Sequence, residues 1–265
     1  MKRKTAEVVV IAITPKGEAR QGHDLVVREL PLTIILDGQE LVTTLCSPAD
    51  LEYMVAGILY SEGIIRNRAD IRSITIEENA GIARAETLSG KVLKTKAAFK
   101  PLVASGGGKG ASGYNLGDLD ELRHNARTTI AARQVFGLMR DFLQHSPIYQ
   151  STHGVHSAAL CDSNSILVFN DDIGRHNALD KVFGQCLMQE LPTEGHIVIS
   201  SGRVSSEILL KVAKRGIAIL ISKSPPTDLG VKLAKDLGIT IIGSTTEKGL
   251  KVYSHNWRVI IGGQQ

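Results

Sequence analysis

Cysteines and aromatic residues are scarce in this chain of 265 residues. The three cysteines, Cys46, Cys161 and Cys186, are far apart in the sequence and form no CxxC pair. This spacing excludes a disulfide framework and a Cys-rich zinc site, and the apolar surroundings of Cys161 and Cys186 are typical of buried free thiols. Aromatic residues make up 4% of the chain and the net charge is only +4. Both values argue against a nucleic-acid-binding protein, because such proteins need a strong basic patch or stacking platforms.

Long hydrophobic runs are also missing, since no apolar stretch reaches the roughly 18 residues that span a bilayer. Residues 1–5 are basic, but an apolar segment with a small-residue cleavage site does not follow them. Residues 14–18 have the composition of a turn instead. We therefore expect a cytoplasmic protein without a membrane segment. The hydrophobic content of 43% and charged content of 22% are ordinary for a globular fold.

The first half of the chain is rich in short β-branched runs. These runs predict strands at residues 8–13, 25–27, 32–36, 40–44, 71–76, 82–86 and 92–97. Ser47 as N-cap and Pro48 at the first helical position predict a helix that ends near Gly63. The glycine-rich residues 104–117 have no apolar face and predict a mobile loop.

The second half changes character, because short apolar strands alternate with amphipathic helices. Strands are predicted at residues 166–169, 197–200, 217–221 and 240–242, and helices at 128–145, 177–190, 205–214 and 228–237. Residues 155–160 suit either a helix or a strand. Continuous apolar strands are typical of a parallel sheet covered by helices on both faces. We expect two domains, a β-rich α+β domain at residues 1–125 and an α/β domain at residues 126–265.

Small polar and basic residues follow three successive strands of the predicted α/β domain. Ligands in such folds bind beyond the carboxyl ends of the strands, where free backbone N–H groups and basic side chains suit a phosphate. Any one of these segments could be an ordinary turn or helix cap. Three of them in register favour a ligand site. The residues in question are Ser201, Gly202 and Arg203 after the first strand, residues 222–225 after the second, and Ser244, Thr245, Thr246, Glu247, Lys248 and Gly249 after the third.

The densest polar cluster is residues 171–177, with the sequence DDIGRHN. It is either the capped start of a helix with a surface ion pair from Asp180 and Lys181, or a recognition loop that uses Arg175 and His176. The density of different chemistries favours the loop. His153, His156 and His176 could in principle bind zinc. However, no other ligand completes a known spacing, and the Pro-Cys-x-x-Cys string of zinc deaminases is absent, so we expect no metal site.

Several strings in both halves resemble the FdhD family of formate dehydrogenase accessory sulfurtransferases. They are SPADLE at residues 47–52, SEGII at 61–65, THGVHSAAL at 152–160, DIGRHNALDK at 172–181 and SGRVSSE at 201–207. The resemblance implies a cytidine-deaminase-like second domain without zinc ligands. It implies sulfur transfer from a cysteine desulfurase to the molybdenum bis-molybdopterin guanine dinucleotide cofactor of formate dehydrogenase. It also implies a homodimer, and assigns Ser244 to Gly249 to cofactor binding.

The chain departs from this family in the loop that carries the persulfide. Where the family has two cysteines, this chain has Gly106 and Lys109. Neither residue can form a persulfide, because that reaction needs a thiolate. Thr246 also stands close to the place of the family's usual arginine. No catalytic residue is therefore assigned.

Three hypotheses remain. The chain could hold the cofactor, or bridge the desulfurase and the dehydrogenase, without a relay cysteine. It could transfer sulfur through another thiol, with Cys46 as the first candidate because it precedes a predicted helix. It could instead be a nucleotide-binding protein or a small-molecule enzyme with His156, Asp172 and His176 as its polar centre.

Overall fold

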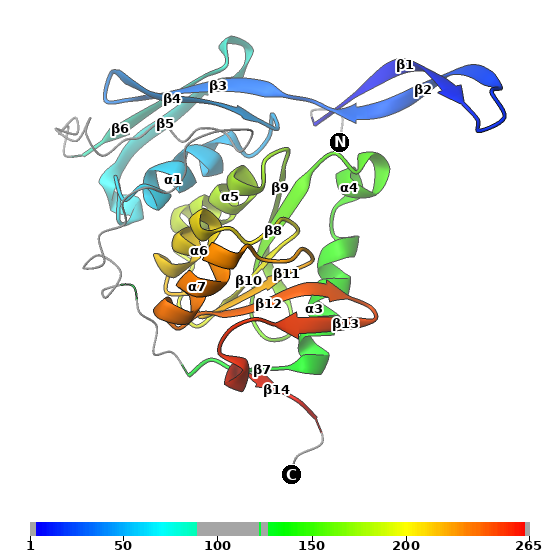
Figure 1. The fold of residues 1–265 in the computed structure, drawn as a ribbon. Helices are drawn as coiled ribbons and strands as arrows, with labels where there is room; N and C mark the ends of the chain where they lie inside the picture. Colours follow the sequence, from blue (N-terminus) through cyan, green and yellow to red (C-terminus); the bar gives the residue numbers. More distant parts are fainter. Residues whose placement is uncertain (1–3, 89–121, 123–126, 263–265) are drawn as a thin grey trace.

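The computed structural model describes residues 4–88, 122 and 127–262. The chain forms two main sheets with helices packed between and beneath them, and a long hairpin that extends away from the rest (Figure 1). The predicted strand at residues 92–97, the glycine-rich loop at 104–117 and the expected domain boundary lie outside the described residues.

The N-terminal part contains the hairpin and a small sheet. Strands β1 (Thr5–Ile13) and β2 (Ala19–Val27) pair antiparallel and form the hairpin, which we call the arm. The small sheet has the order β4-β3-β6-β5. Its strands are β3 (Leu30–Leu36), β4 (Gln39–Cys46), β5 (Ile71–Glu77) and β6 (Ile82–Thr87). Helix α1 (Leu51–Ser61) packs on it, and short 3-10 turns occupy Arg68–Asp70 and Glu78–Ala80.

The predicted start of α1 at Ser47 is wrong, because the helix begins at Leu51 after a left-handed Asp50 with φ of 55°. Ser47 makes long-range contacts instead. Its backbone N–H donates to Asp172 Oδ2 at 3.0 Å, and its hydroxyl oxygen accepts from the Ile173 N–H at 3.1 Å. These tertiary hydrogen bonds take the place of the local cap that the Ser-Pro signal suggested.

The large sheet has six strands in the order β13-β12-β11-β10-β8-β9. Its strands are β8 (His156–Cys161), β9 (Ile166–Asp172), β10 (Ile197–Ser200), β11 (Ile219–Ser222), β12 (Thr240–Thr246) and β13 (Gly249–Val252). Only the pairs β10–β11 and β11–β12 are parallel, so the expectation of a parallel sheet holds for the centre alone. Residues 155–160, for which the sequence allowed either a helix or a strand, belong mainly to strand β8.

Helices cover both faces of this sheet, as the apolar strands indicated. Helices α5 (Arg175–Met188), α6 (Ser206–Ala213) and α7 (Asp228–Leu237) form a buried core with one face. Helix α3 (Ala132–Gln144) forms a second core with the other face. Beside it, α4 (Pro147–Thr152) is a helix that our reading of the sequence missed, although Ser146 before Pro147 is the capping signal that could have found it.

Several element boundaries differ from the sequence-based expectations. Helix α3 begins at Ala132 rather than 128, because Ile130 pairs with Val259 where β7 (Ile130–Ala131) meets β14 (Val259–Ile260). Helix α5 lies two residues earlier than expected at each end. Strand β12 continues to Thr246 and turns back into β13, so residues 243–246 are strand and not loop. A 3-10 turn at Asn256–Arg258 precedes β14.

Glycines allow α1 and α5 to cross in direct backbone contact. A Cβ atom on Gly57 would overlap the Asp180 carbonyl, and one on Gly184 would overlap the Tyr53 carbonyl. Helix α1 of the small sheet is thereby packed tightly against helix α5 of the large sheet.

Candidate anion-binding site

Polar side chains gather at one end of the large sheet because of its strand directions. Strand β8 runs antiparallel to both neighbours, so its first residue, His156, lies opposite Asp172 at the end of β9 and close to the end of β10. A cavity of about 300 Å³ opens there. It is lined by Tyr149, His153, Gly154, Val155, His156, Ile173, Ser201, Lys223 and Ser224.

Ser201 and His156 form a hydrogen bond inside this cavity. The Ser201 hydroxyl oxygen accepts from the Ser157 N–H at 3.0 Å, so its single proton is free to point at His156 Nδ1, 3.2 Å away. Burial lowers the pKa of His156 below 6.5, and the positive charge of Arg175 lowers it further. The imidazole is therefore neutral at pH 7, and in the tautomer with its proton on Nε2 it accepts the Ser201 hydrogen bond at Nδ1.

Hydrogen bonds connect the three strand ends that the sequence singled out. The Ser224 hydroxyl donates to the Ser201 carbonyl at 2.8 Å, and the Ser244 N–H donates to the Ser224 carbonyl at 3.2 Å. Ser244 has a left-handed backbone with φ of 52° at a bulge in β12. The first residue of the third segment thus lies beside the cavity.

The rest of that third segment moves away along the β12–β13 hairpin. The Thr245 side chain is buried and its hydroxyl has no hydrogen-bond partner among the described residues, whereas Thr246, Glu247 and Lys248 are exposed. Gly249 begins the return strand.

Arg175 begins helix α5, and Arg203 lies in the loop between β10 and α6, two residues after Ser201 of the cavity. The N-cap residue Gly174 offers no side-chain cap to this helix. The Arg175 side chain passes over Gly202, where an added Cβ would lie only 2.8–2.9 Å from it. Burial lowers the pKa of Arg175, and the like charge of Arg203 adds to this effect. Arg175 Nε has no hydrogen-bond partner within the part of the chain that the structure describes.

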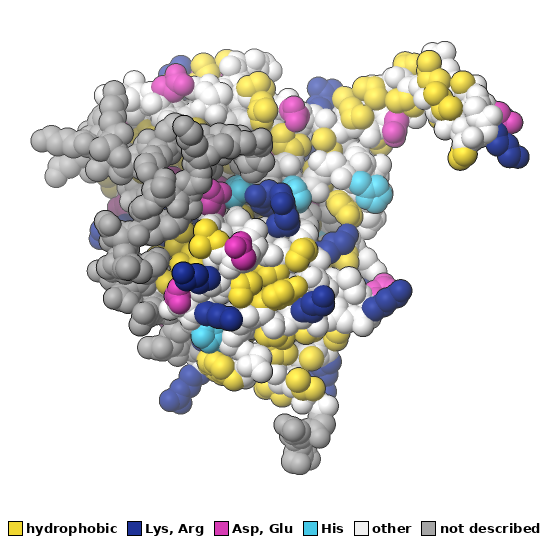
Figure 2. Space-filling view, viewed as in Figure 1, with side chains coloured by type: hydrophobic (Ala, Val, Ile, Leu, Met, Phe, Trp, Pro, Cys, Tyr) yellow, Lys and Arg dark blue, Asp and Glu magenta, His cyan; other side chains and the backbone are white. Residues whose placement is uncertain are grey.

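His176 adds a second buried nitrogen without a hydrogen bond. Its side chain is 8% exposed, and its Nε2 lies 3.3 Å from Glu207 Oε2 without forming a hydrogen bond in the described structure. Burial lowers the pKa of His176 to about 3, helped by the charges of Lys211 and Arg175. An uncapped helix N-terminus, two crowded arginines and unpaired nitrogens together favour an anionic ligand. In Figure 2, Lys and Arg side chains lie beside histidines on the side of the molecule that is shown.

Asp172 is buried beneath this site and positions its residues, but its carboxylate is not exposed to a ligand. It is fully buried, and its carboxylate pairs with the Lys181 ammonium at 2.7 Å. The same carboxylate accepts from the Gly174 N–H at 2.9 Å and from the Asn177 amide at 2.9 Å. It therefore holds the segment that leads into α5, and this burial argues against Asp172 as the polar centre of an enzyme.

Asp180 and Lys181 do not form the surface ion pair of the alternative, capped-helix interpretation. Both side chains are buried, and each binds a different partner: Lys181 binds Asp172, and Asp180 binds Lys211 at 2.6 Å. The Ser61 hydroxyl of α1 also donates to Asp180 at 2.7 Å. These groups stabilise the seam between the helices.

All three cysteines are buried free thiols. Burial raises the pKa of Cys46, Cys161 and Cys186 to about 12 in each case. The Cys46 thiol, which was the first candidate for an alternative relay, donates to the Leu30 carbonyl at 3.5 Å and has no exposed surface. None of the three presents a thiolate to a partner in this conformation. Gly106 and Lys109 lie outside the described residues.

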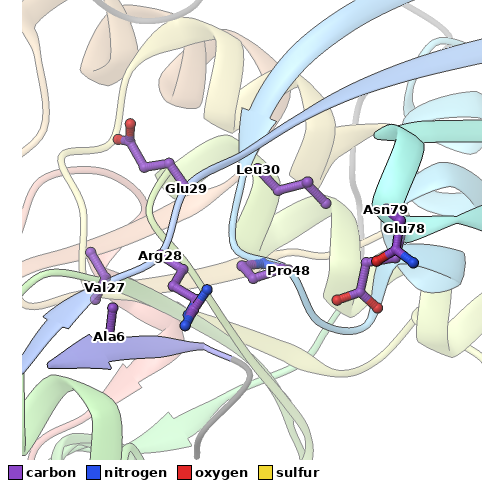
Figure 3. A pocket seen from close by; sticks show the side chains of 8 residues that line it. All are labelled: Ala6, Val27, Arg28, Glu29, Leu30, Pro48, Glu78 and Asn79. Carbon is purple, nitrogen blue, oxygen red and sulfur yellow. The ribbon is translucent and has the colours of Figure 1, made fainter.

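A second cavity, of about 430 Å³, lies at the base of the arm (Figure 3). It is lined by Ala6, Val27, Arg28, Glu29, Leu30, Pro48, Glu78 and Asn79. It is larger than the first cavity, but two glutamates and only one arginine line it, and Arg28 Nε already donates to the Thr5 carbonyl at 2.9 Å. Its charge does not favour an anion, so we place the candidate site at the smaller cavity.

Neither a metal-ligand cluster nor a membrane-spanning helix occurs within the described residues. No group of three or more His, Cys, Asp or Glu side chains is placed there to hold a metal ion. In the same residues, no helix is long and apolar enough to cross a bilayer.

The fold and site define a mixed α/β protein with an anion-favouring cluster at the strand ends of its large sheet. The family model for FdhD/NarQ matches residues 27–260, and the chain belongs to this family. It is 41% identical over 244 residues to the sulfur carrier protein FdhD of Bacillus licheniformis, covering 92% of this chain and 93% of the relative. It is 40% identical over 245 residues to the FdhD of Bacillus subtilis, covering 92% and 94%.

A solved structure has the same fold. It is the crystal structure of a candidate formate dehydrogenase accessory protein from Desulfotalea psychrophila, with a TM-score of 0.79 and 26% sequence identity. The match covers 97% of this chain and all of the other.

Proposed function

We propose that this chain is a formate dehydrogenase accessory protein that binds molybdenum bis-molybdopterin guanine dinucleotide and assists its sulfuration without carrying the sulfur on a cysteine of its own. Family membership supports a role in sulfur delivery, since its relatives are named sulfur carrier proteins, and the solved structure with the same fold is named as a formate dehydrogenase accessory protein. The observation that carries the binding proposal is the pair of buried nitrogens, Arg175 Nε and His176 Nε2, that have no hydrogen bond among the described residues at the uncapped start of α5.

The residues present fit a phosphate-bearing part of this cofactor. Crowded like charges such as Arg175 and Arg203 are relieved when an anion lies between them. The cavity of about 300 Å³ is at the lower end of the range for small-molecule sites, so it suits one nucleotide end rather than the whole cofactor. Arg175, Arg203 and the backbone near Ser244 would hold that end. When bound, the cofactor supplies the molybdenum centre that formate dehydrogenase uses.

In this function, the thiol that carries the sulfur belongs to another protein. Sulfur transfer needs an accessible thiolate, and the pKa values of about 12 deny one to the three native cysteines. A cysteine desulfurase persulfide, or a cysteine-bearing relative, would deliver sulfur to cofactor held here. Formate dehydrogenase would then receive the cofactor.

Two finer points belong to the same proposal. We infer a cytidine-deaminase-like fold for the second half, supported by its mixed sheet with helices on both faces. We also keep the cytoplasm as the proposed location, which rests on the sequence alone.

Calorimetry with GDP tests the binding part. GDP stands in for the guanine dinucleotide end, and we expect heat of binding that weakens with added salt. Changing both Arg175 and Arg203 to Ala should weaken binding at least ~10-fold, because a hydrogen bond to a charged group contributes about 1.5–3 kcal/mol. Arg140→Ala is the matched control, since Arg140 is 70% exposed on α3 and pairs with its neighbour Asp141. An absence of heat at millimolar GDP would refute the binding proposal.

A persulfide assay tests the sulfur part separately. The protein is incubated with a cysteine desulfurase and cysteine, and its mass is measured under non-reducing conditions. We expect no persulfide adduct on the native chain. An adduct on Cys46 would show that this thiol becomes accessible and would restore the relay through another cysteine.

A further inference from the structure

The segment that leads into Arg175 and helix α5 has little local support. Its N-cap residue, Gly174, has no side chain that could cap the helix, and its backbone is extended, with φ of −107° and ψ of 129°. Glycine restrains the backbone less than other residues do. Ile173, which precedes it, lines the cavity of the candidate anion site. The positions of Ile173 and Arg175 therefore depend on contacts from other parts of the chain.

Ser47, in the loop between β4 and α1, provides such contacts with each of its polar groups. Its hydroxyl oxygen accepts from the Ile173 N–H at 3.1 Å, and its own N–H donates to Asp172 Oδ2 at 3.0 Å. Its carbonyl accepts from the Lys181 ammonium at 3.2 Å. Ser47 is buried, so water does not compete for these bonds. A residue of the N-terminal part thus holds the backbone of a residue that lines the anion cavity.

Asp172 connects Ser47 to the start of α5. Its Oδ2 atom accepts from the Ser47 N–H, and its Oδ1 atom accepts from the Gly174 N–H at 2.9 Å. The Asn177 amide donates to the same Oδ1 at 2.9 Å and to the Leu45 carbonyl at 2.8 Å. The β4–α1 loop and the start of α5 therefore share one buried hydrogen-bond network.

We propose that Ser47 is a positioning residue of the candidate anion site, through which the N-terminal part of the chain sets the affinity for a phosphate-bearing ligand. The network fixes the N–H groups of Ile173 and Gly174, the two residues before Arg175. A site held in its binding geometry loses less entropy when a ligand binds. Without the Ser47 hydroxyl, this backbone is less restrained and the ligand binds more weakly. The inference rests on the proposed function, because it concerns the same site.

A matched serine separates positioning from general stabilisation. Ser61 also lies in the N-terminal part and is 2% exposed, compared with 1% for Ser47. Its hydroxyl also bonds to α5, where it donates to Asp180 at 2.7 Å, more than one helical turn beyond Arg175. Because that acceptor is charged, its loss should cost at least as much stability as loss of the Ser47 hydroxyl. If Ser47 acted only on stability, Ser61→Ala would weaken ligand binding as much as Ser47→Ala.

Calorimetry with GDP tests the effect on affinity. Ser47→Ala should raise the dissociation constant ~3–10-fold, which corresponds to about one hydrogen bond, and Ser61→Ala should leave it within ~2-fold of the native value. An unchanged dissociation constant in Ser47→Ala, or an equal rise in both variants, would overturn the inference and leave the proposed function standing. A native chain that binds no GDP would refute the proposed function and this inference together.

Hydrogen exchange tests the positioning without a ligand. Peptides that cover residues 172–177 should exchange faster in Ser47→Ala than in the native chain, because the Ile173 N–H loses its acceptor. Ser61→Ala should leave these peptides unchanged. Unchanged exchange there in a folded Ser47→Ala variant would refute the positioning role.

Circular dichroism checks that each variant is folded. If Ser47→Ala does not fold, Asn177→Ala takes its place in both measurements, because it removes the bond to the Leu45 carbonyl of the same network. The same rise in dissociation constant and the same faster exchange are expected. Native values of both quantities in a folded Asn177→Ala variant would overturn the inference.

Discussion

Protection of the cysteines from a thiol reagent is the most direct test of how this chain handles sulfur. Burial raises the pKa of each of the three thiols to about 12. At pH 8 a thiol with that pKa is ionised to about 1 part in 10⁴, whereas an ordinary thiol of pKa ~8.5 is about one quarter ionised. Because the thiolate is the reacting form, we expect labelling at least ~10³-fold slower than for an exposed cysteine.

The assay is a reaction with a chromogenic disulfide reagent at pH 8, followed by unfolding in guanidinium. The native chain should release no chromophore within minutes, and unfolding should release three equivalents. Arg140→Cys is the positive comparison, because the side chain at residue 140 is 70% exposed on α3. That variant should react quickly with one equivalent before unfolding.

One fast equivalent from the native chain would refute the burial argument. Mass mapping would then identify the cysteine, and Cys46 would again be a candidate for sulfur relay.

Two further predictions concern stability, measured by urea unfolding. Gly57→Ala should lower the free energy of unfolding by about 2 kcal/mol or more, because its Cβ overlaps the Asp180 carbonyl. Gly137→Ala in α3, where a Cβ meets no atom within 4 Å, should instead raise it by about 0.5–1 kcal/mol. Equal effects of the two changes would contradict the helix crossing. For His176, the folded pKa of about 3 lies below the ordinary 6.5, so the unfolded state binds more protons between these values. Stability should therefore fall as pH drops from 6.5 towards 3, by up to about 1.4 kcal/mol per pH unit from this group, and His176→Gln should flatten the decline. An unchanged pH slope in that variant would show that other groups cause it.

Local patterns located most helices and strands correctly, and they failed where distant residues compete for the same atoms. The Ser47-Pro48 signal was wrong because Asp172, far along the sequence, takes the Ser47 N–H. The start of α3 was placed too early because Ile130 pairs with Val259 in a short two-stranded sheet. Neither of these long-range contacts can be recognised from the periodicity of apolar residues in the sequence.

The site was predictable in part. The polar segments at residues 171–177, 201–203 and 222–225 stood out by composition, and the structure brings Ser201, Ser224 and Ser244 together. Tyr149, whose hydroxyl oxygen accepts from the Lys223 ammonium at 3.0 Å at the cavity, lies on the short helix α4, which does not signal a site by itself. The sequence could not show that Thr245 is buried, because that depends on the bulge in β12.

The sequence by itself determined the family, the layered α/β architecture and the absence of cysteine at residues 106 and 109. These follow from motif strings, apolar periodicity and residue identity, all of which are local properties. Only the tertiary structure decided which thiols are buried, which carboxylates pair with which lysines, and which apolar side chains of the arm are exposed. Those properties depend on burial and on strand order, and both are set by contacts between residues far apart in the chain.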